Sequence, residues 1–298
     1  DVKIVSPVSG TIKRIIRGPK RKIENIIIES STNQESIIHE VRGWKKMDIN
    51  NLKQLLMKSG NWSFIHQRPY GIMANPIDTP KSIFVTTAKT DPLREDYHFV
   101  LKEDQKEFQL GIDLLNRLVD QPVFLGLDKS YSGYFESIEG VQHYSFEGPH
   151  PAGNLSLHIQ KLSPLNMNDR VWTVNPEDVV NIGRFISSGV FSPQRTIAVS
   201  GNAVENPKYF KTKIGAELAP ILNKVGIKFD NVRVINGDVL TGSTALISDH
   251  LGYFNNLVTV IPEGSHYRMF GWLPFKDNKI LSLSNTSLSR LFNRKGFE

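Results

Sequence analysis

Three runs say most about the fold of this chain. They are Gly148-Pro149-His150-Pro151-Ala152-Gly153, then Val171-Trp172-Thr173-Val174-Asn175, and then Asp178-Val179-Val180-Asn181-Ile182-Gly183-Arg184. In the first run, two prolines and two glycines within six residues impose a tight, irregular backbone around His150. An ordinary connection between two elements does not need such a loop, so we expect a site there. The third run begins a helix that is predicted over 178–187 and ends at Gly189.

Upstream of this stretch, helical and strand patterns alternate. A helix is predicted over 48–58 with Asp48 as its cap, and an amphipathic helix over 102–119. The apolar runs at 83–87 and 122–127 predict buried strands. Strands that alternate with helices in this way predict an α/β domain from about residue 40 to 190.

The region before this domain has a β pattern. Strands are predicted over 2–5, 11–16 and 23–29. The pattern Pro7-x-x-Gly10-x-Ile12 resembles half of a barrel-sandwich hybrid, the fold of lipoyl and biotinyl carriers, without the carrier lysine motif. We expect the other half of this barrel upstream, and the chain to be part of a longer protein.

After residue 195 the predicted elements follow the order strand, strand, helix, strand. Their ranges are 196–201, 207–212, 216–225 for the helix, and 232–237. This order indicates a small β-grasp unit. Two further strands and a final helix are predicted beyond it: 257–261, 269–273 and 284–291.

Composition narrows the class of protein. The 298 residues suffice for two or three domains with a sizeable core, and 39% hydrophobic with 22% charged residues is typical of a globular protein. The absence of cysteine excludes disulfides, thiolate-held iron–sulfur clusters and cysteine zinc sites. No apolar run reaches the roughly 20 residues of a membrane helix, and no signal peptide is visible.

The net charge of +6 is concentrated near the N-terminus, where the basic residues are Lys13, Arg14, Arg17, Lys20, Arg21, Lys22, Arg42, Lys45 and Lys46. Such clusters bind nucleic acid or anionic membranes, or they form a solvated face, which we favour. Because no aromatic or glycine pattern of a nucleic-acid module accompanies the charges, we expect no nucleic-acid partner.

Several catalytic and cofactor motifs are missing. Neither G-x-G-x-x-G nor G-x-x-x-x-G-K-[ST] occurs, so the α/β domain lacks the usual glycine cradle for a nucleotide or flavin. G-x-S-x-G is absent as well, which leaves hydrolase chemistry without support. His143, His150 and His158 fall within 16 residues, but structural roles are favoured over a metal site. His150 is the best functional candidate of the three, against the alternative of a loop histidine that bonds to backbone.

Distinctive strings along nearly the whole chain carry a family resemblance. They include Ser6-Pro7-Val8-Ser9-Gly10, Arg68-Pro69, Thr90-Asp91-Pro92-Leu93, Gly148 to Gly153, Val171 to Asn175, Gly237-Asp238-Val239-Leu240-Thr241-Gly242 and Phe270-Gly271-Trp272. With them, the chain resembles the A subunit of the Na⁺-translocating NADH:quinone oxidoreductase, a bacterial respiratory complex.

The resemblance implies a multidomain α+β and α/β fold in four segments. Residues 1–38 would be the second half of a barrel-sandwich hybrid, and 39–190 a Rossmann-like α/β domain without a nucleotide loop. Residues 191–247 would be a β-grasp domain of the soluble-ligand-binding type, and 248–298 a β-rich segment leading into a truncated C-terminal region.

The resemblance also implies a function. The chain would be a subunit without a redox cofactor of its own, peripheral on the cytoplasmic side of the bacterial inner membrane and held there by partner subunits. NADH and flavins would be handled by those subunits, while electrons pass from NADH to quinone and Na⁺ is exported. This chain would assist quinone binding or assembly and be inactive alone.

The segment 61–70 supplies the residues expected at a quinone. A quinone headgroup is a flat ring with two carbonyl acceptors, and it requires stacking surfaces and hydrogen-bond donors. We expect the contacts from five residues: Trp62, Arg68, Pro69, Tyr70 and, from the proline-flanked loop, His150. The alternative, which composition alone favours, is that the aromatic rings are core and Arg68 is a surface charge.

Three other classes compete with this hypothesis. A purely structural adaptor would bury Trp62 far from any cavity. A related electron-transfer subunit with iron–sulfur clusters conflicts with the absence of cysteine. A free flavin or nicotinamide oxidoreductase conflicts with the missing phosphate loop.

Overall fold

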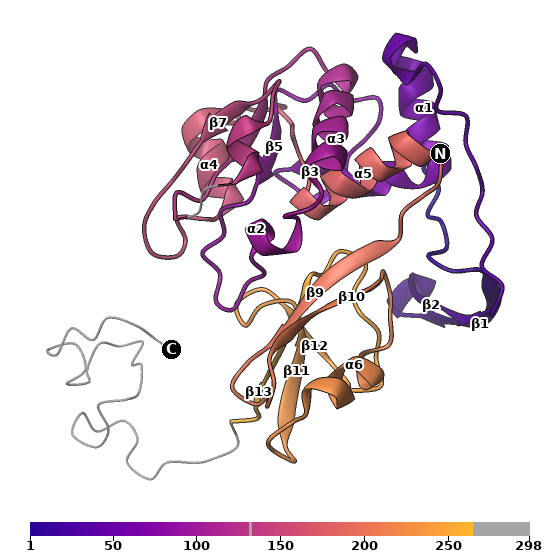
Figure 1. Cartoon of the computed structure of the whole chain (residues 1–298), viewed down its shortest axis with the longest axis vertical. Coiled ribbons are helices and arrows are strands. Elements are labelled where there is room, and N and C mark those ends of the chain that lie inside the picture. The colour runs from indigo at the N-terminus through magenta and orange to yellow at the C-terminus, as the bar shows by residue number, and fades with distance from the viewer. Residues whose placement is uncertain (131–132, 265–298) are drawn as a thin grey trace, which may run out of the picture. The chain divides into compact units, whose positions relative to one another are not determined.

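The larger sheet of the chain has six strands in the order β4-β3-β8-β5-β6-β7. Figure 1 labels three of them, β3, β5 and β7. The structure is a computed structural model that describes residues 1–130 and 133–264, of which 1–262 form one unit. The strands are β3 (His66–Arg68), β4 (Ile72–Met73), β5 (Ile83–Thr86), β6 (Val123–Gly126), β7 (Gln142–Tyr144) and β8 (Val171–Thr173). Strands β8, β5, β6 and β7 are parallel, and β3 is antiparallel to β4 and β8. The two strands predicted from apolar runs are confirmed as β5 and β6.

Helices cover both faces of this sheet. Side chains alternate between the two faces along each strand, so neighbouring residues of one strand pack against different helices. Ile83 and Val85 of β5 belong to the core that α3 (Gln105–Leu118) and α5 (Pro176–Ser188) also line. Phe84, between them in sequence, packs on the other face with Ile159 of α4 (Leu155–Leu162). The predicted α/β class is therefore confirmed, and the Rossmann-like label stays a more specific prediction.

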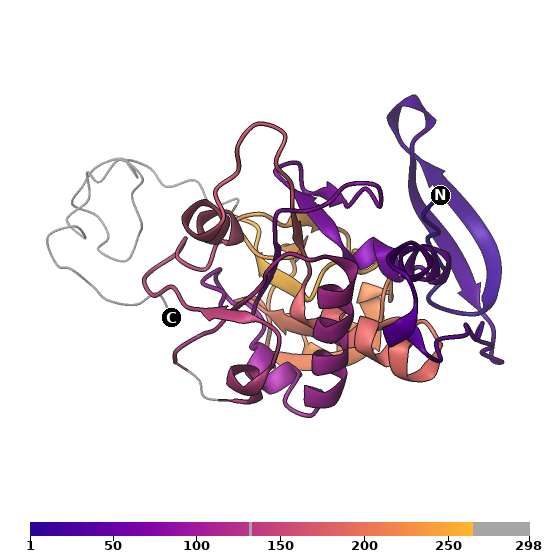
Figure 2. The ribbon, with the colours of Figure 1, turned by 90° about the horizontal axis from the view of Figure 1, so that it is seen from above.

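Two glycines allow α3 and α5 to lie side by side, as Figure 2 shows. A Cβ on Gly111 would overlap the carbonyl oxygen of Val179, and one on Gly183 would overlap that of Glu107. Glycine is required at both positions by this close approach.

The helix predicted over 48–58 is confirmed as α1 (Ile49–Ser59). The Asp48 carboxylate caps it by accepting from the backbone N–H groups of Asn50 and Asn51, and Gly60 ends it with φ of 84°. The short helix α2 (Tyr97–Val100) comes between β5 and α3.

The smaller sheet has five strands in the order β10-β9-β13-β11-β12. They are β9 (Gln194–Ser200), β10 (Lys208–Lys213), β11 (Val232–Asn236), β12 (Ser243–Ala245) and β13 (Leu257–Pro262), and α6 (Leu218–Val225) shares their core. β13 lies in the middle, parallel to β9 and antiparallel to β11. It comes after the boundary expected at residue 247, and β12 was not predicted.

The N-terminal residues form an antiparallel hairpin of β1 (Gly10–Arg17) and β2 (Ile23–Ser30). The prediction of a strand over 2–5 was wrong. Lys3 donates its backbone N–H to Met57 O at 3.1 Å, and Val5 lies against Gly60. Residues 2–5 therefore lie against the C-terminal end of α1 and do not belong to a sheet.

The strand predicted over 269–273 and the helix predicted over 284–291 lie outside the described residues. In the part that the structure describes, no helix combines the length and apolar character needed to cross a bilayer.

Candidate functional site

The carboxyl ends of β5 and β8 mark the point where the strand order of the larger sheet reverses. From β5 the chain continues through β6 to β7 on one side, and it returns to β8 on the other side. Open α/β sheets bind ligands in the crevice at such a point, often with phosphate at a helix N-terminus. The loop 87–96 after β5 and Asn175 after β8 border this position.

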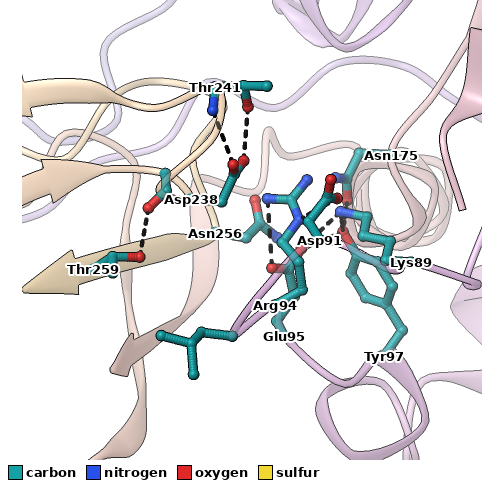
Figure 3. A network of polar contacts seen from close by, with 12 residues as sticks. Lys89, Asp91, Arg94, Glu95, Tyr97, Asn175, Asp238, Thr241, Asn256 and Thr259 are labelled. Atoms are coloured by element: carbon teal, nitrogen blue, oxygen red, sulfur yellow. Dashed lines mark hydrogen bonds and ion pairs between the residues drawn. The ribbon is translucent and has the colours of Figure 1, made fainter. Parts of the chain in front are cut away.

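Four polar side chains meet there (Figure 3). Lys89 Nζ donates to Glu95 Oε1 and to Tyr97 Oη, at 2.8 Å in each case. Tyr97 Oη also lies 2.7 Å from Glu95 Oε1 and 3.0 Å from Asn175 Oδ1. Glu95 and Tyr97 are buried, so these side chains occupy the volume at the switch point themselves.

The charges in this network alter one another's protonation. Burial alone would raise the pKa of the Glu95 carboxyl, but the cations Lys89 and Arg94 outweigh burial and lower it to about 2. Burial lowers the pKa of the Lys89 ammonium, which Glu95 opposes. Burial, with Glu95 beside it, raises the pKa of the Tyr97 hydroxyl well above its usual value.

The first turn of α5, next to this network, is acidic. Glu177 and Asp178 are both buried there, and their cation is Arg195 at the start of β9. Arg195 Nη1 lies 2.8 Å from Asp178 Oδ1 and 3.6 Å from Glu177 Oε2. Glu177 also accepts from Thr196 N at 2.6 Å and from Asn256 Nδ2 at 2.7 Å. These contacts join the first turn of α5 to the smaller sheet.

Two carboxyls that share one buried cation cannot both ionise freely. Burial raises the pKa of Glu177 to about 7, although Arg195 and the Thr196 N–H oppose it. Burial also raises the pKa of Asp178, again against Arg195. A phosphate group at this helix N-terminus would face these carboxyls, and the fit for a nucleotide or flavin phosphate is poor.

A polar pocket of about 250 Å³ adjoins Arg94. Its other wall is the turn after β11, in which Asp238 accepts from Leu240 N and from the backbone N–H and hydroxyl of Thr241. Arg94 Nε donates to Asp91 Oδ2 at 3.1 Å, and Phe254 lines the pocket as well.

The proline-flanked loop docks on the segment after β5. His150 Nδ1 lies 3.2 Å from Thr90 Oγ1 and 3.6 Å from Asp91 Oδ1, and Gly153 N donates to Thr90 Oγ1 at 2.9 Å. The His150 side chain therefore has side-chain partners at the carboxyl edge of the sheet.

The other two histidines of the predicted cluster have separate partners. His158 lies between Ala152 O and Tyr144 Oη, and His143 contacts Phe135 O. Among residues 1–130 and 133–264, no three His, Asp or Glu side chains form a cluster that would hold a metal ion.

The remaining predicted quinone residues lie elsewhere. Arg68, at the end of β3, is paired with Val171 at the amino end of β8, so it lies at the opposite edge of the sheet from His150. Tyr70 is 64% exposed, and the Arg170 guanidinium lies over its ring at 5.1 Å. Pro69, in the same turn, is exposed too.

Trp62 has no exposed face. Its side chain is fully buried, its Nε1 donates to Ala74 O at 2.7 Å, and its ring meets Trp172 edge-on at 5.4 Å. The structure thus groups Arg68, Pro69 and Tyr70, and separates them from the buried Trp62 and from His150.

The fold and the network define an α/β protein whose switch point holds its own buried side chains, joined to a smaller β-rich part. Comparison with known proteins agrees with this division. Residues 47–191 match the model of the NqrA second alpha/beta domain, and residues 196–246 match that of the NQRA C-terminal domain.

Curated relatives extend over the whole chain. The A subunit of the Na(+)-translocating NADH-quinone reductase of Neisseria meningitidis serogroup A is 32% identical over 300 residues, which cover 100% of this chain and 67% of that protein. The same subunit of Rhodopirellula baltica is 35% identical, covering 90% of this chain and 60% of that protein. The chain therefore belongs to the family formed by the A subunits of the Na⁺-translocating NADH-quinone reductases, and it spans about two thirds of the length of these relatives.

A solved structure shares the fold. An NAD⁺-reducing [NiFe]-hydrogenase in the H2-reduced state is similar with a TM-score of 0.51 at 15% identity, over 72% of this chain and 47% of that chain. At this identity, the likeness concerns the fold alone.

Proposed function

We propose that this chain is a peripheral, cofactor-free subunit of a Na⁺-translocating NADH:quinone reductase, which contributes to quinone binding or to assembly of the complex. The observation that carries the proposal is the 32% identity to the A subunit of such a reductase over 100% of the chain. Electron transfer from NADH to quinone and Na⁺ export would be activities of the complex, on whose cytoplasmic side this subunit would lie.

The cofactor-free character is supported by the switch point. Lys89, which would be the cation available to a phosphate there, is bonded to Glu95 and Tyr97. The adjoining helix begins with the acids Glu177 and Asp178. A dinucleotide would have to displace buried, mutually bonded side chains, so the flavins and NADH would belong to other subunits.

Quinone contact is best supported at the group Arg68, Pro69 and Tyr70. Tyr70 offers an exposed ring, the Arg170 guanidinium lies over it as one donor, and Arg68 stands two residues earlier in the same turn. Arg68 Nε is buried and has no hydrogen-bond partner among the described residues. Because this donor is buried, a quinone carbonyl would reach it and supply the missing acceptor only if the turn at Pro69 opened on binding. Trp62 is buried apart from this group, and His150 remains a second candidate at the opposite edge.

A structural adaptor is the second candidate function. It is favoured by the full burial of Trp62, whose ring packs on Trp172 and not on an open surface. In that case the polar networks would fix the domain geometry for partner subunits, and quinone would bind elsewhere in the complex.

The test of the proposal is co-purification. A tagged copy of the full chain would be expressed with the other subunits, and detergent-solubilised membranes would be affinity-purified. We expect a multi-subunit complex with Na⁺-stimulated NADH:quinone reductase activity. Recovery of the tagged chain alone, from membranes that contain the intact activity, would refute subunit membership.

A further inference from the structure

The turn of the β1–β2 hairpin carries a dense group of cations. We name as the basic tip the residues Arg14, Arg17, Lys20, Arg21 and Lys22, which are all exposed. Within residues 1–130 and 133–264, none of these five makes an ion pair, and the ion pair in this hairpin joins Lys13 to Glu29 at 3.7 Å. Glu24 is the one acid next to the turn, so five cations face a single carboxylate.

The turn is defined by its own hydrogen bonds. Gly18 N donates to Lys22 O at 2.8 Å, Lys22 N to Pro19 O at 3.2 Å, and Arg17 Nη1 to Arg21 O at 3.1 Å. Lys20 and Arg21 both have left-handed backbones, with φ of 55° and 60°. Such a conformation is unfavourable for a residue with a Cβ, and neither exposed side chain has a buried contact that offsets it. The backbone therefore holds successive cations out at the end of the hairpin.

The cations of the basic tip match an anionic lipid surface, because headgroup phosphates pair with clustered Lys and Arg side chains. Figure 2 draws the hairpin that carries them in indigo. Single-stranded nucleic acid is a poorer match, because residues 10–30 contain no aromatic side chain for base stacking.

We infer that the basic tip binds anionic phospholipid headgroups and places the hairpin directly on the membrane surface. The choice of a lipid surface over an acidic protein rests on the proposed function, which puts this chain beside a bilayer. The contact is additional to any attachment through partner subunits.

The test is sedimentation of the full chain with vesicles. One set contains phosphatidylcholine with about one third phosphatidylglycerol, and the other contains phosphatidylcholine alone. Each cation at an anionic surface contributes about a fivefold gain in partitioning, so reversal of three should lower binding by more than about 100-fold. The variant is Lys20→Glu, Arg21→Glu and Lys22→Glu combined. We expect the unaltered chain to bind the anionic vesicles and to be released by high salt.

A matched control makes the same change in net charge elsewhere. Lys46→Glu, Lys58→Glu and Lys211→Glu replace three exposed cations that lie on separate elements. This control should retain most of the binding, and both triple variants should keep the melting temperature of the unaltered chain. Equal loss in both variants, or no binding of the unaltered chain, would overturn the inference.

The assembled complex separates this inference from the proposed function. Absence of vesicle binding together with normal co-purification of the chain would refute the lipid contact and leave subunit membership intact. Loss of co-purification in the tip variant, without any vesicle binding, would identify an acidic protein surface as the partner and would also overturn the lipid contact.

Discussion

The guanidinium of Arg195 lies 2.8 Å from the carboxylate of Asp178, with both side chains excluded from solvent. This pair connects the first turn of α5 to β9, because Asp178 belongs to the helix and Arg195 to the strand. This buried ion pair thus joins the helix that packs on the larger sheet to the smaller sheet, and breaking it is destabilising.

Replacing the buried cation should be strongly destabilising. Arg195→Met would leave Glu177 and Asp178 without their cation, and we expect a loss of about 3–5 kcal/mol in the free energy of unfolding at pH 7. Urea denaturation followed by circular dichroism measures this loss. The double variant Arg195→Met, Asp178→Asn should recover part of it, and a single-variant loss below about 1 kcal/mol would show that the pair is not buried as described.

The raised pKa of Glu177 predicts a pH dependence of defined sign. Between the ordinary carboxyl value and about 7, the folded state keeps a proton that the unfolded state has released. Stability should therefore fall as the pH rises through this interval, by up to about 1.4 kcal/mol per pH unit. In Glu177→Gln this contribution disappears. The difference in the free energy of unfolding between the variant and the unaltered chain should therefore change between about pH 5 and about pH 7.5. Parallel stability curves over that range would contradict the prediction.

The contact between α3 and α5 predicts an unusual glycine effect. Alanine favours a helix over glycine by about 1 kcal/mol, yet Gly183→Ala would place a methyl group into the Glu107 carbonyl. We expect a net destabilisation of about 1–3 kcal/mol, visible as a lowered melting temperature. Lys106→Ala, on the exposed side of α3, is the control and should change stability by less than about 0.5 kcal/mol. A more stable Gly183→Ala would mean that the helices can separate without penalty.

The proposed quinone surface predicts a loss of affinity. Titration with a short-chain quinone, followed by tryptophan fluorescence and corrected for inner-filter absorption, should show saturable quenching. Arg68→Ala or Tyr70→Ala should weaken binding by about tenfold, which corresponds to about 1.4 kcal/mol for a lost donor or stacking contact. Lys58→Ala, at an exposed position on α1, is the matched control. Unchanged affinity in both variants, or linear quenching alone, would favour the adaptor.

Most of the regular elements followed from local pattern. Asp48 and Gly60 begin and end α1 through contacts with the nearby backbone. The strand predicted over 83–87 follows from a run of apolar side chains. Both kinds of signal are local, so a single sequence suffices to predict these elements. Short strands escaped prediction. β3 and β8 have three residues each, and their register is fixed by neighbours distant in the chain.

The candidate site was harder to predict, because pairing between distant residues creates it. Lys89 and Asn175 are far apart in sequence and meet through Tyr97 only after β5 and β8 become neighbours. Glu177 and Asp178 are visible in the sequence, but acids are common in the first turn of a helix, so they indicate neither burial nor Arg195 as their partner.

The central position of β13 constrains the order in which this protein can fold. The hairpin of β9 with β10 and the pair of β11 with β12 are synthesised earlier, yet each leaves open the edge that β13 covers. The smaller sheet therefore cannot close until the ribosome has released residues 257–262. During that interval, two unpaired edges are exposed to neighbouring nascent chains, and this is the stage at which a chaperone would protect the protein from aggregation.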